Sequence, residues 1–405
     1  LHFADTLRRP RQRTGLGGLA GELAAVAARV TQRLLRLPLA VRPPRAEDRC
    51  GVDELWSRLK DLTEEQQLTV VRVGPEFQNW ALAEWLMEES VTEASRDLER
   101  AASLARLARE VAERVPGPED WQNRIRGYAE AALPNVSRVA GELEAARAGI
   151  EQAKKLWAAG SDPQGLLDPG RLLDLEASLC RDERRFAEAL KLLDEAAAVS
   201  HQKGRILINK GFTLEVMGEA EQAIVTLLQA KPLVEAQGDA RLLNMLHLNL
   251  GVAYCNAGRH AEAAELVEKV RSLATEMGDQ IGLLRVLWLE GRIAAGLGHT
   301  VEAALLLEQA RREFEAREMW YSAALAQLEI APLLLAEGRT ARVKEMAAEL
   351  VVIFQEKGIH REALAALQLF QDAAEREEAT AELARQVLRF LFRSRWDEGL
   401  RFGEG

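Results

Sequence analysis

The chain has 405 residues, of which 48 % are hydrophobic and 29 % charged, enough apolar material for a large buried core. Its formal net charge of −10 argues against a general binder of nucleic acids or anionic membranes, and no apolar run approaches the roughly 18 residues of a membrane-spanning helix. Three widely separated cysteines without metal-ligand spacing (Cys50, Cys180 and Cys255) are typical of a reducing compartment, so we expect a cytoplasmic protein.

Residues 1–50 have a composition of their own. They hold ten Arg, no Lys and four acidic residues, a net charge of +6, so the remainder carries −16. Residues 22–36 are predicted to form an amphipathic helix that ends before Pro38. We interpret residues 1–50 as a basic leader, partly helical or disordered. Its origin as the remnant of an upstream domain is an alternative that stays open.

Residues 51–76 are predicted to form a helical cap at the start of the main body. The first helix is expected over residues 52–59. Thr63 and Gln66 have the spacing of a capping box and predict the start of a second helix, which Gly74 and Pro75 end.

From residue 77 the chain shows internal repetition. Ala, Leu, Glu and Arg dominate, which favours helices over strands. Six turn positions are expected at 141, 184, 218, 258, 298 and 338, four of them 40 residues apart. In most copies a small residue lies seven positions before the turn, and small residues again lie five and twelve positions after it. Small side chains at these places let two antiparallel helices approach closely, so the pattern predicts stacked helix pairs.

Two copies carry the pattern most clearly: Leu250-Gly251, Tyr254, Gly258, Ala263 and Val270, then Leu289-Glu290-Gly291, Gly298, Ala303 and Ala310. These residues resemble the tetratricopeptide repeat. The resemblance covers roughly residues 77–393. It implies an all-α, right-handed α-α superhelix of about eight antiparallel helix hairpins, followed by a flexible tail at 394–405. Pro134 departs from the pattern and predicts a kink.

The 40-residue steps are longer than the usual repeat and resemble those of the C-terminal tetratricopeptide regions of bacterial signal-sensing regulators. No nucleophile–base pair, metal-ligand cluster or phosphate loop is evident, so we expect no catalytic residues, no metal and no cofactor. The chain is therefore predicted not to be an enzyme.

The concave groove lined by the first helix of each pair is the expected binding site. Asn209 and Asn249 each lie nine residues before a turn glycine, where chaperone-binding tetratricopeptide domains carry an Asn that bonds a peptide's main chain or terminal carboxylate. Arg285 falls where such domains carry a cationic clamp residue. Further groove candidates are Phe212, Trp288, Arg292 and Glu329. The alternative is that all seven residues are inter-repeat packing or helix-surface residues.

Three functions remain open at this level. The first is a scaffold that binds a protein or peptide in the groove. The second is the sensor half of a bacterial helix-turn-helix transcriptional regulator whose DNA-binding domain lies upstream, and the third, least supported, is a helical-repeat enzyme. We expect no membrane partner and no direct nucleic-acid binding by residues 51–405. The apolar last helix is expected to cap the array, with a homodimer contact as the alternative.

Overall fold

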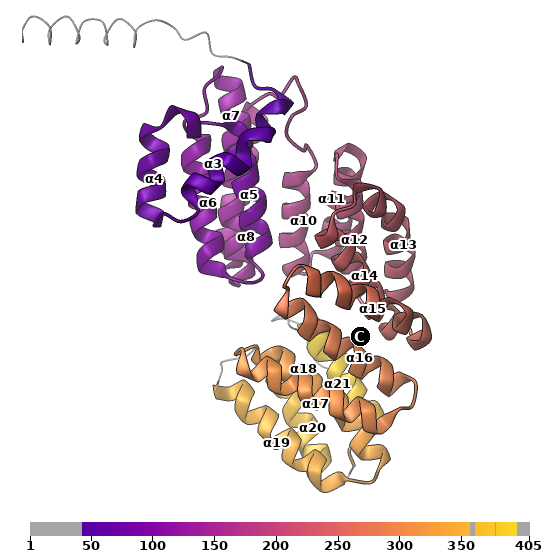
Figure 1. Cartoon of the computed structure of the whole chain (residues 1–405). Coiled ribbons are helices and arrows are strands. Elements are labelled where there is room, and N and C mark those ends of the chain that lie inside the picture. Colours follow the sequence, from indigo (N-terminus) through magenta and orange to yellow (C-terminus); the bar gives the residue numbers. More distant parts are fainter. Residues whose placement is uncertain (1–42, 357–360, 377, 395–405) are drawn as a thin grey trace, which may run out of the picture.

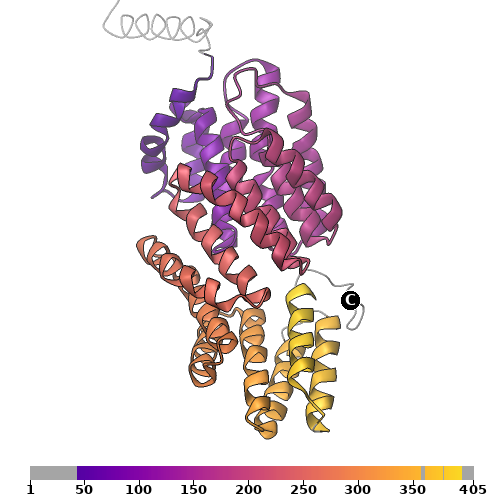
Figure 2. The same cartoon turned by 90° about the vertical axis from the view of Figure 1, so that its right-hand side faces the viewer.

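The computed structural model describes residues 43–356, 361–376 and 378–394 (Figure 1). Every regular element in these ranges is helical. The predicted helix at 22–36 and the tail from 395 lie outside the described residues. Figures 1 and 2 show an elongated stack in which the helix pairs broadly follow chain order, from the indigo end to the yellow end.

Four short helical elements open the described chain, and eight helix pairs follow. The opening elements are η1 (Ala46–Gly51), α3 (Val52–Leu59), α4 (Glu64–Val73) and η2 (Pro75–Phe77). The pairs are α5 (Trp80–Glu93) with α6 (Leu98–Ala112), α7 (Glu119–Glu130) and α8 (Ala132–Val139) with α9 (Leu143–Ala159), α10 (Arg171–Asp182) with α11 (Phe186–Val199), α12 (Lys203–Val216) with α13 (Ala220–Gln237), α14 (Ala240–Asn256) with α15 (His260–Glu276), α16 (Gln280–Gly296) with α17 (Thr300–Ala316), α18 (Trp320–Ala336) with α19 (Thr340–Glu356), and α20 (Arg361–Glu375) with α21 (Ala381–Ser394).

The six predicted turns are confirmed by the backbone. Each turn residue has a positive φ, from 59° at Arg184 to 88° at Gly218. This left-handed conformation suits glycine, which has no Cβ to clash with the following carbonyl. The structure adds a second series that the sequence pattern did not reveal. Gly238, Gly278 and Glu318 also have positive φ and form the return turns between pairs. From α13 to α19 a new helix therefore begins every 20 residues.

The small residues of the pattern lie where helices touch. A Cβ on Gly211 would come within 2.5 Å of Leu227 in the partner helix, and one on Gly291 would come within 2.8 Å of Leu307. Ala263 and Ala303 are fully buried. This confirms the prediction that small residues recur because the paired helices approach each other closely at these positions.

The expected disturbance at Pro134 appears as a break in the helix. α7 ends at Glu130 and α8 restarts at Ala132, so Pro134 lies in the first turn of a new helix, where its missing N–H costs no hydrogen bond. Its ring packs on Gly149, where an added Cβ would lie 2.4 Å from Pro134 Cγ.

One side of the stack is formed by the first helix of each pair. α10, α12, α14, α16 and α18 each pack on the next member of this series, whereas no comparable packing joins α11, α13, α15 and α17. The stack therefore curves toward the first series. We call the side formed by α10, α12, α14, α16 and α18 the inner face.

The N-terminal part has a different core. Its aromatic side chains meet in pairs, with Trp56 against Trp85 at 5.0 Å between ring centroids and Trp80 against Trp121 at 6.0 Å. Residues 46–50, which the sequence placed in the leader, belong to this body. Arg49 forms a bidentate pair with Glu84 at 2.7 and 2.8 Å. The predicted capping box of Thr63 is present.

Candidate functional site on the inner face

Two of the predicted groove residues join neighbouring helices of the inner face. Asn209 Nδ2 donates to Asp174 Oδ1 in α10 at 2.6 Å. The Phe212 ring lies under the guanidinium of Arg181, 4.9 Å from its carbon to the ring centroid. Both contacts connect α12 to α10, so these two side chains are engaged in packing between pairs.

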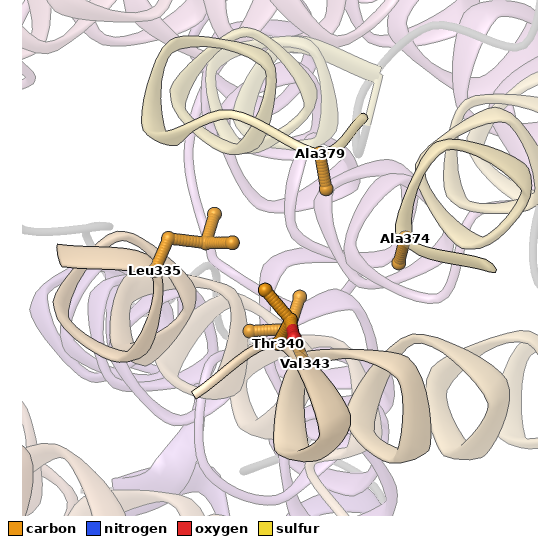
Figure 3. A pocket seen from close by; sticks show the side chains of 5 residues that line it. All are labelled: Leu335, Thr340, Val343, Ala374 and Ala379. Atoms are coloured by element: carbon orange, nitrogen blue, oxygen red, sulfur yellow. The ribbon is translucent and has the colours of Figure 1, made fainter. Parts of the chain in front are cut away.

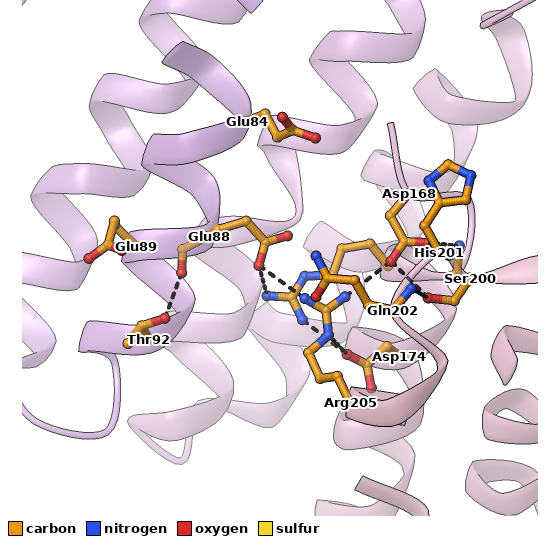
Figure 4. Close-up of polar contacts among 12 residues, drawn as sticks. Glu84, Glu88, Glu89, Thr92, Asp168, Asp174, Ser200, His201, Gln202 and Arg205 are labelled. Carbon is orange, nitrogen blue, oxygen red and sulfur yellow. Dashed lines mark hydrogen bonds and ion pairs between the residues drawn. The ribbon is translucent and has the colours of Figure 1, made fainter. Parts of the chain in front are cut away.

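A cluster of buried charges fixes the N-terminal part to the array (Figure 4). We call Glu88, Asp168, Arg171, Asp174 and Arg205 the ionic cluster. Arg171 lies 2.6 Å from Glu88 and 3.0 Å from Asp174, and Arg205 lies 3.3 Å from Glu88 and 3.2 Å from Asp168. Three helices and the segment before α10 thus share one set of ion pairs.

Opposing effects set the protonation of the ionic cluster. Burial alone would raise the pKa of Glu88, but the positive charges of Arg171 and Arg205 outweigh burial and lower that pKa. Burial would lower the pKa of Arg171, yet the carboxylates of Glu88 and Asp174 raise it. The opposite charges of Glu88 and Arg171 therefore stabilise each other despite their burial.

α5 and the turn after it reach further along the inner face. Glu89 pairs with Arg241 at the start of α14 at 3.1 Å. Arg96 lies 3.4 Å from Asp279, the residue that caps α16. Ion pairs thus join this one element to α10, α12, α14 and α16.

A row of polar contacts crosses the other end of the inner face. Asn256 donates to Glu215 at 2.7 Å and accepts from Arg292 at 2.6 Å, and Arg292 pairs with Glu329 at 2.9 Å. Four successive inner helices are linked in this way. Burial raises the pKa of Glu329 to about 6, although Arg292 and the Trp288 indole oppose that rise.

Trp288 belongs to the same group of contacts. Its Nε1 donates to Glu329 at 2.7 Å. Its ring lies parallel to that of Phe392 in α21, with 5.6 Å between centroids and 4° between planes. The Arg292 guanidinium also lies over Phe392, at 5.5 Å. The predicted residues Trp288, Arg292 and Glu329 therefore lie together, and Trp288 and Arg292 contact α21, the last helix that the structure describes.

Asn249 and Arg285 differ from the other five predicted groove residues, which all contact another part of the chain. Asn249 is half-buried and Arg285 is exposed, and neither has a hydrogen bond or an ion pair with any described residue. Although the side chain of Arg285 is exposed at the surface, atoms of neighbouring residues crowd around its guanidinium, and this partial desolvation lowers its pKa. Asp279 opposes this effect, and the charge of Arg96 adds to it. An unpaired guanidinium in such surroundings favours an incoming anion.

Among the residues that the structure describes, no group of His, Cys, Asp or Glu could hold a metal ion, and no helix is both long and apolar enough to cross a membrane. A small gap between α18, α19 and the last pair is apolar and lined by five side chains (Figure 3): Leu335, Thr340, Val343, Ala374 and Ala379. An open depression lies between α11, α12 and α13, where Lys210 pairs with Asp194. Neither brings together groups that could act in catalysis.

The architecture defines an α-helical solenoid. Within it, residues 240–316 match the family model of the tetratricopeptide repeat, and the fold is a right-handed superhelix of such hairpins. The chain is similar in structure to a Rap protein in complex with competence and sporulation factor, with a TM-score of 0.59, 11 % identity, and coverage of 78 % of this chain and 87 % of that one.

A second similar structure is a signal-transduction ATPase with a tetratricopeptide repeat sensor from Pyrococcus horikoshii. The TM-score is 0.53 at 15 % identity, over 88 % of this chain and 54 % of that one. No curated protein matches the chain in sequence. At these identities the likeness establishes the fold alone.

Sequence reasoning missed the ionic cluster and two members of the polar row, Glu215 and Asn256. The partners in the ionic cluster are up to 117 positions apart, as for Glu88 and Arg205. No spacing rule connects such residues. The one available signal was an arginine in the first turn of both α10 and α12, Arg171 and Arg205.

Proposed function

We propose that the chain is a non-catalytic scaffold that binds a protein or peptide on its inner face, at Asn249 and Arg285. One observation carries this proposal. These two side chains are free to bond a ligand, whereas the other five predicted residues are engaged within the chain: Asn209, Phe212, Trp288, Arg292 and Glu329.

The chemistry of the two free groups suggests the class of ligand. A side-chain amide can both donate to and accept from an extended main chain. A guanidinium can bind a carboxylate through two parallel hydrogen bonds. An acidic peptide, or one that ends in a free carboxylate near Arg285, fits this pair. The similar Rap structure, which holds competence and sporulation factor, supports a ligand-binding role for this kind of fold.

A selection from a random peptide library tests the proposal. Peptides enriched on the wild-type chain are assayed against Asn249→Ala with Arg285→Glu, with circular dichroism as the check of folding. The matched control is Gln309→Ala with Lys269→Glu on the outer helices α17 and α15, where both side chains are exposed. We expect the inner-face double variant to bind at least about 30-fold more weakly, the value for roughly 2 kcal/mol. Equal binding by both double variants would reject the proposal.

A sensor role within a larger regulator is the second candidate. The likeness to a structure whose repeat part is described as a sensor favours it. The genomic sequence preceding Leu1 tests this candidate. An in-frame helix-turn-helix region would support it, and a start codon directly before Leu1 would contradict it.

A further inference from the structure

The last helix lies against inner helices of earlier pairs. α21, and not α20, packs along α18. The Tyr321 hydroxyl in α18 donates to the carbonyl of Leu391. The Phe392 ring then reaches α16, where it stacks on Trp288. In Figure 1 the yellow α21 is seen beside α16 and α18.

The residues that surround the Phe392 side chain favour an aromatic ring at this position. One face of the ring meets the Trp288 indole, and the Arg292 guanidinium lies over the ring. Glu329 holds both residues, since it accepts from the indole and pairs with the guanidinium. Stacking and cation–π contacts both favour an aromatic residue here over an aliphatic one of similar size.

Two arginines of α21 share one carboxylate of the same helix. Arg385 and Arg389 both pair with Glu382, at 3.2 and 2.8 Å. Its other side is apolar, with Ala384, Val387 and Leu391 buried. α5, by contrast, is joined to the inner helices through ion pairs that need particular partners. A different amphipathic helix with the same apolar pattern could make the contacts of α21.

We propose that α21 occupies the α16–α18 part of the inner face in cis, and that the partner for this part is an amphipathic helix that places an aromatic ring on Trp288 in the position of Phe392. This inference rests on the proposed partner-binding role of the inner face, but it concerns a different section from Asn249 and Arg285. α21 competes with such a partner at an effective concentration on the order of millimolar. The partner therefore binds weakly until the contacts of α21 with α16 and α18 are weakened.

The test uses the full chain and, as the probe, a fluorescein-labelled peptide with the sequence of residues 381–394. Fluorescence anisotropy measures its binding to the wild-type chain and to a Phe392→Ala chain. We expect the variant chain to bind at least about tenfold more tightly, because its own helix competes less well. A probe that itself carries Phe392→Ala should bind the variant chain at least about tenfold more weakly.

A second chain variant, Leu391→Ala with Phe392→Ala, loosens α21 further while circular dichroism follows its folding. If this variant loses helicity and the probe restores it, a helix in trans has taken the position of α21, as proposed. The proposal is overturned if both variants stay folded and bind no probe. It is also overturned if the double variant unfolds and the probe does not rescue it, or if the two probes bind equally. The library comparison at Asn249 and Arg285 involves other residues, so a negative result here leaves the proposed function standing.

Discussion

The helix array from α10 to α19 and the N-terminal part from η1 to α9 are stabilised by different physics. In the first region, small residues recur in phase, and each pair nests against the next through buried Ala and Gly positions such as Ala303 and Gly291. In the second, paired tryptophans fill the core and the ionic cluster connects distant helices. Steric nesting repeats along the sequence and can be read from it. A charge cluster assembles once, from residues that only the finished fold brings together.

The largest expected effect comes from breaking the ionic cluster. Glu88→Ala leaves the buried guanidiniums of Arg171 and Arg205 without one shared partner, and should cost about 3–5 kcal/mol in the free energy of unfolding. Glu89→Ala is the matched control, because its pair with Arg241 is half exposed and should be worth less than about 1 kcal/mol. Urea denaturation of both variants measures the difference. Similar losses for the two would show that the cluster does not hold the N-terminal part in place.

Overpacking tests the nesting of the repeats. Ala303 is fully buried, so Ala303→Leu should destabilise the fold by about 1–3 kcal/mol. The same substitution at Ala316, at the exposed end of the same helix, should be nearly neutral. Thermal unfolding compares the two. A neutral Ala303→Leu would mean that small side chains are not required at this position.

One charged group inside the regular array, Glu329, is expected to make the stability of the chain depend on pH. Steric nesting is therefore not the only contribution to stability in that region. The pKa of Glu329 is about 6 in the folded chain against a usual value of 4.5, so the folded state binds this proton more tightly. Stability from this group is fully present below pH 4.5 and is lost as the pH rises through 6. As the pH rises from below 4.5 to above 6, the free energy of unfolding of the wild type should fall by on the order of 2 kcal/mol relative to that of Glu329→Gln.

Urea denaturation of wild type and Glu329→Gln at pH 4.5 and pH 7 measures this change. Glu337→Gln, at an exposed position about two helical turns later, is the control and should show no such trend. A difference between wild type and Glu329→Gln that stays constant with pH would contradict the account of the polar row.

The smallest effect concerns the return turns. Glu318 has a φ of 57°, and its exposed side chain has no partner among the described residues; it occupies the position that Gly238 and Gly278 take in earlier pairs. Glu318→Gly should therefore stabilise the chain by about 0.5–1 kcal/mol, since relief of the left-handed backbone exceeds the entropy cost of glycine. Gly278→Ala should act in the opposite direction. Thermal unfolding of the two variants checks the signs, and a destabilising Glu318→Gly would contradict this account of the turn.

The fold could be predicted well from the sequence because the repeat depends on local features of each helix pair. All six turn positions, the buried small residues and the disturbance near Pro134 follow from backbone sterics within one helix pair. The candidate site was predicted only in part. Spacing placed Trp288, Arg292 and Glu329 in neighbouring inner helices, but it could not show that Phe392, about 100 positions from Trp288, packs on them.

Chemical modification of arginines tests the central claim most directly, that Arg285 is a free cation at which a ligand binds. Phenylglyoxal labelling followed by mass spectrometry compares Arg285 with Arg292 in the same helix, without and with a library-selected peptide. We predict that Arg285 reacts quickly alone and is protected by the peptide, while the paired Arg292 reacts slowly in both cases. Labelling of Arg285 at an unchanged rate in the presence of saturating peptide would contradict the proposed binding site.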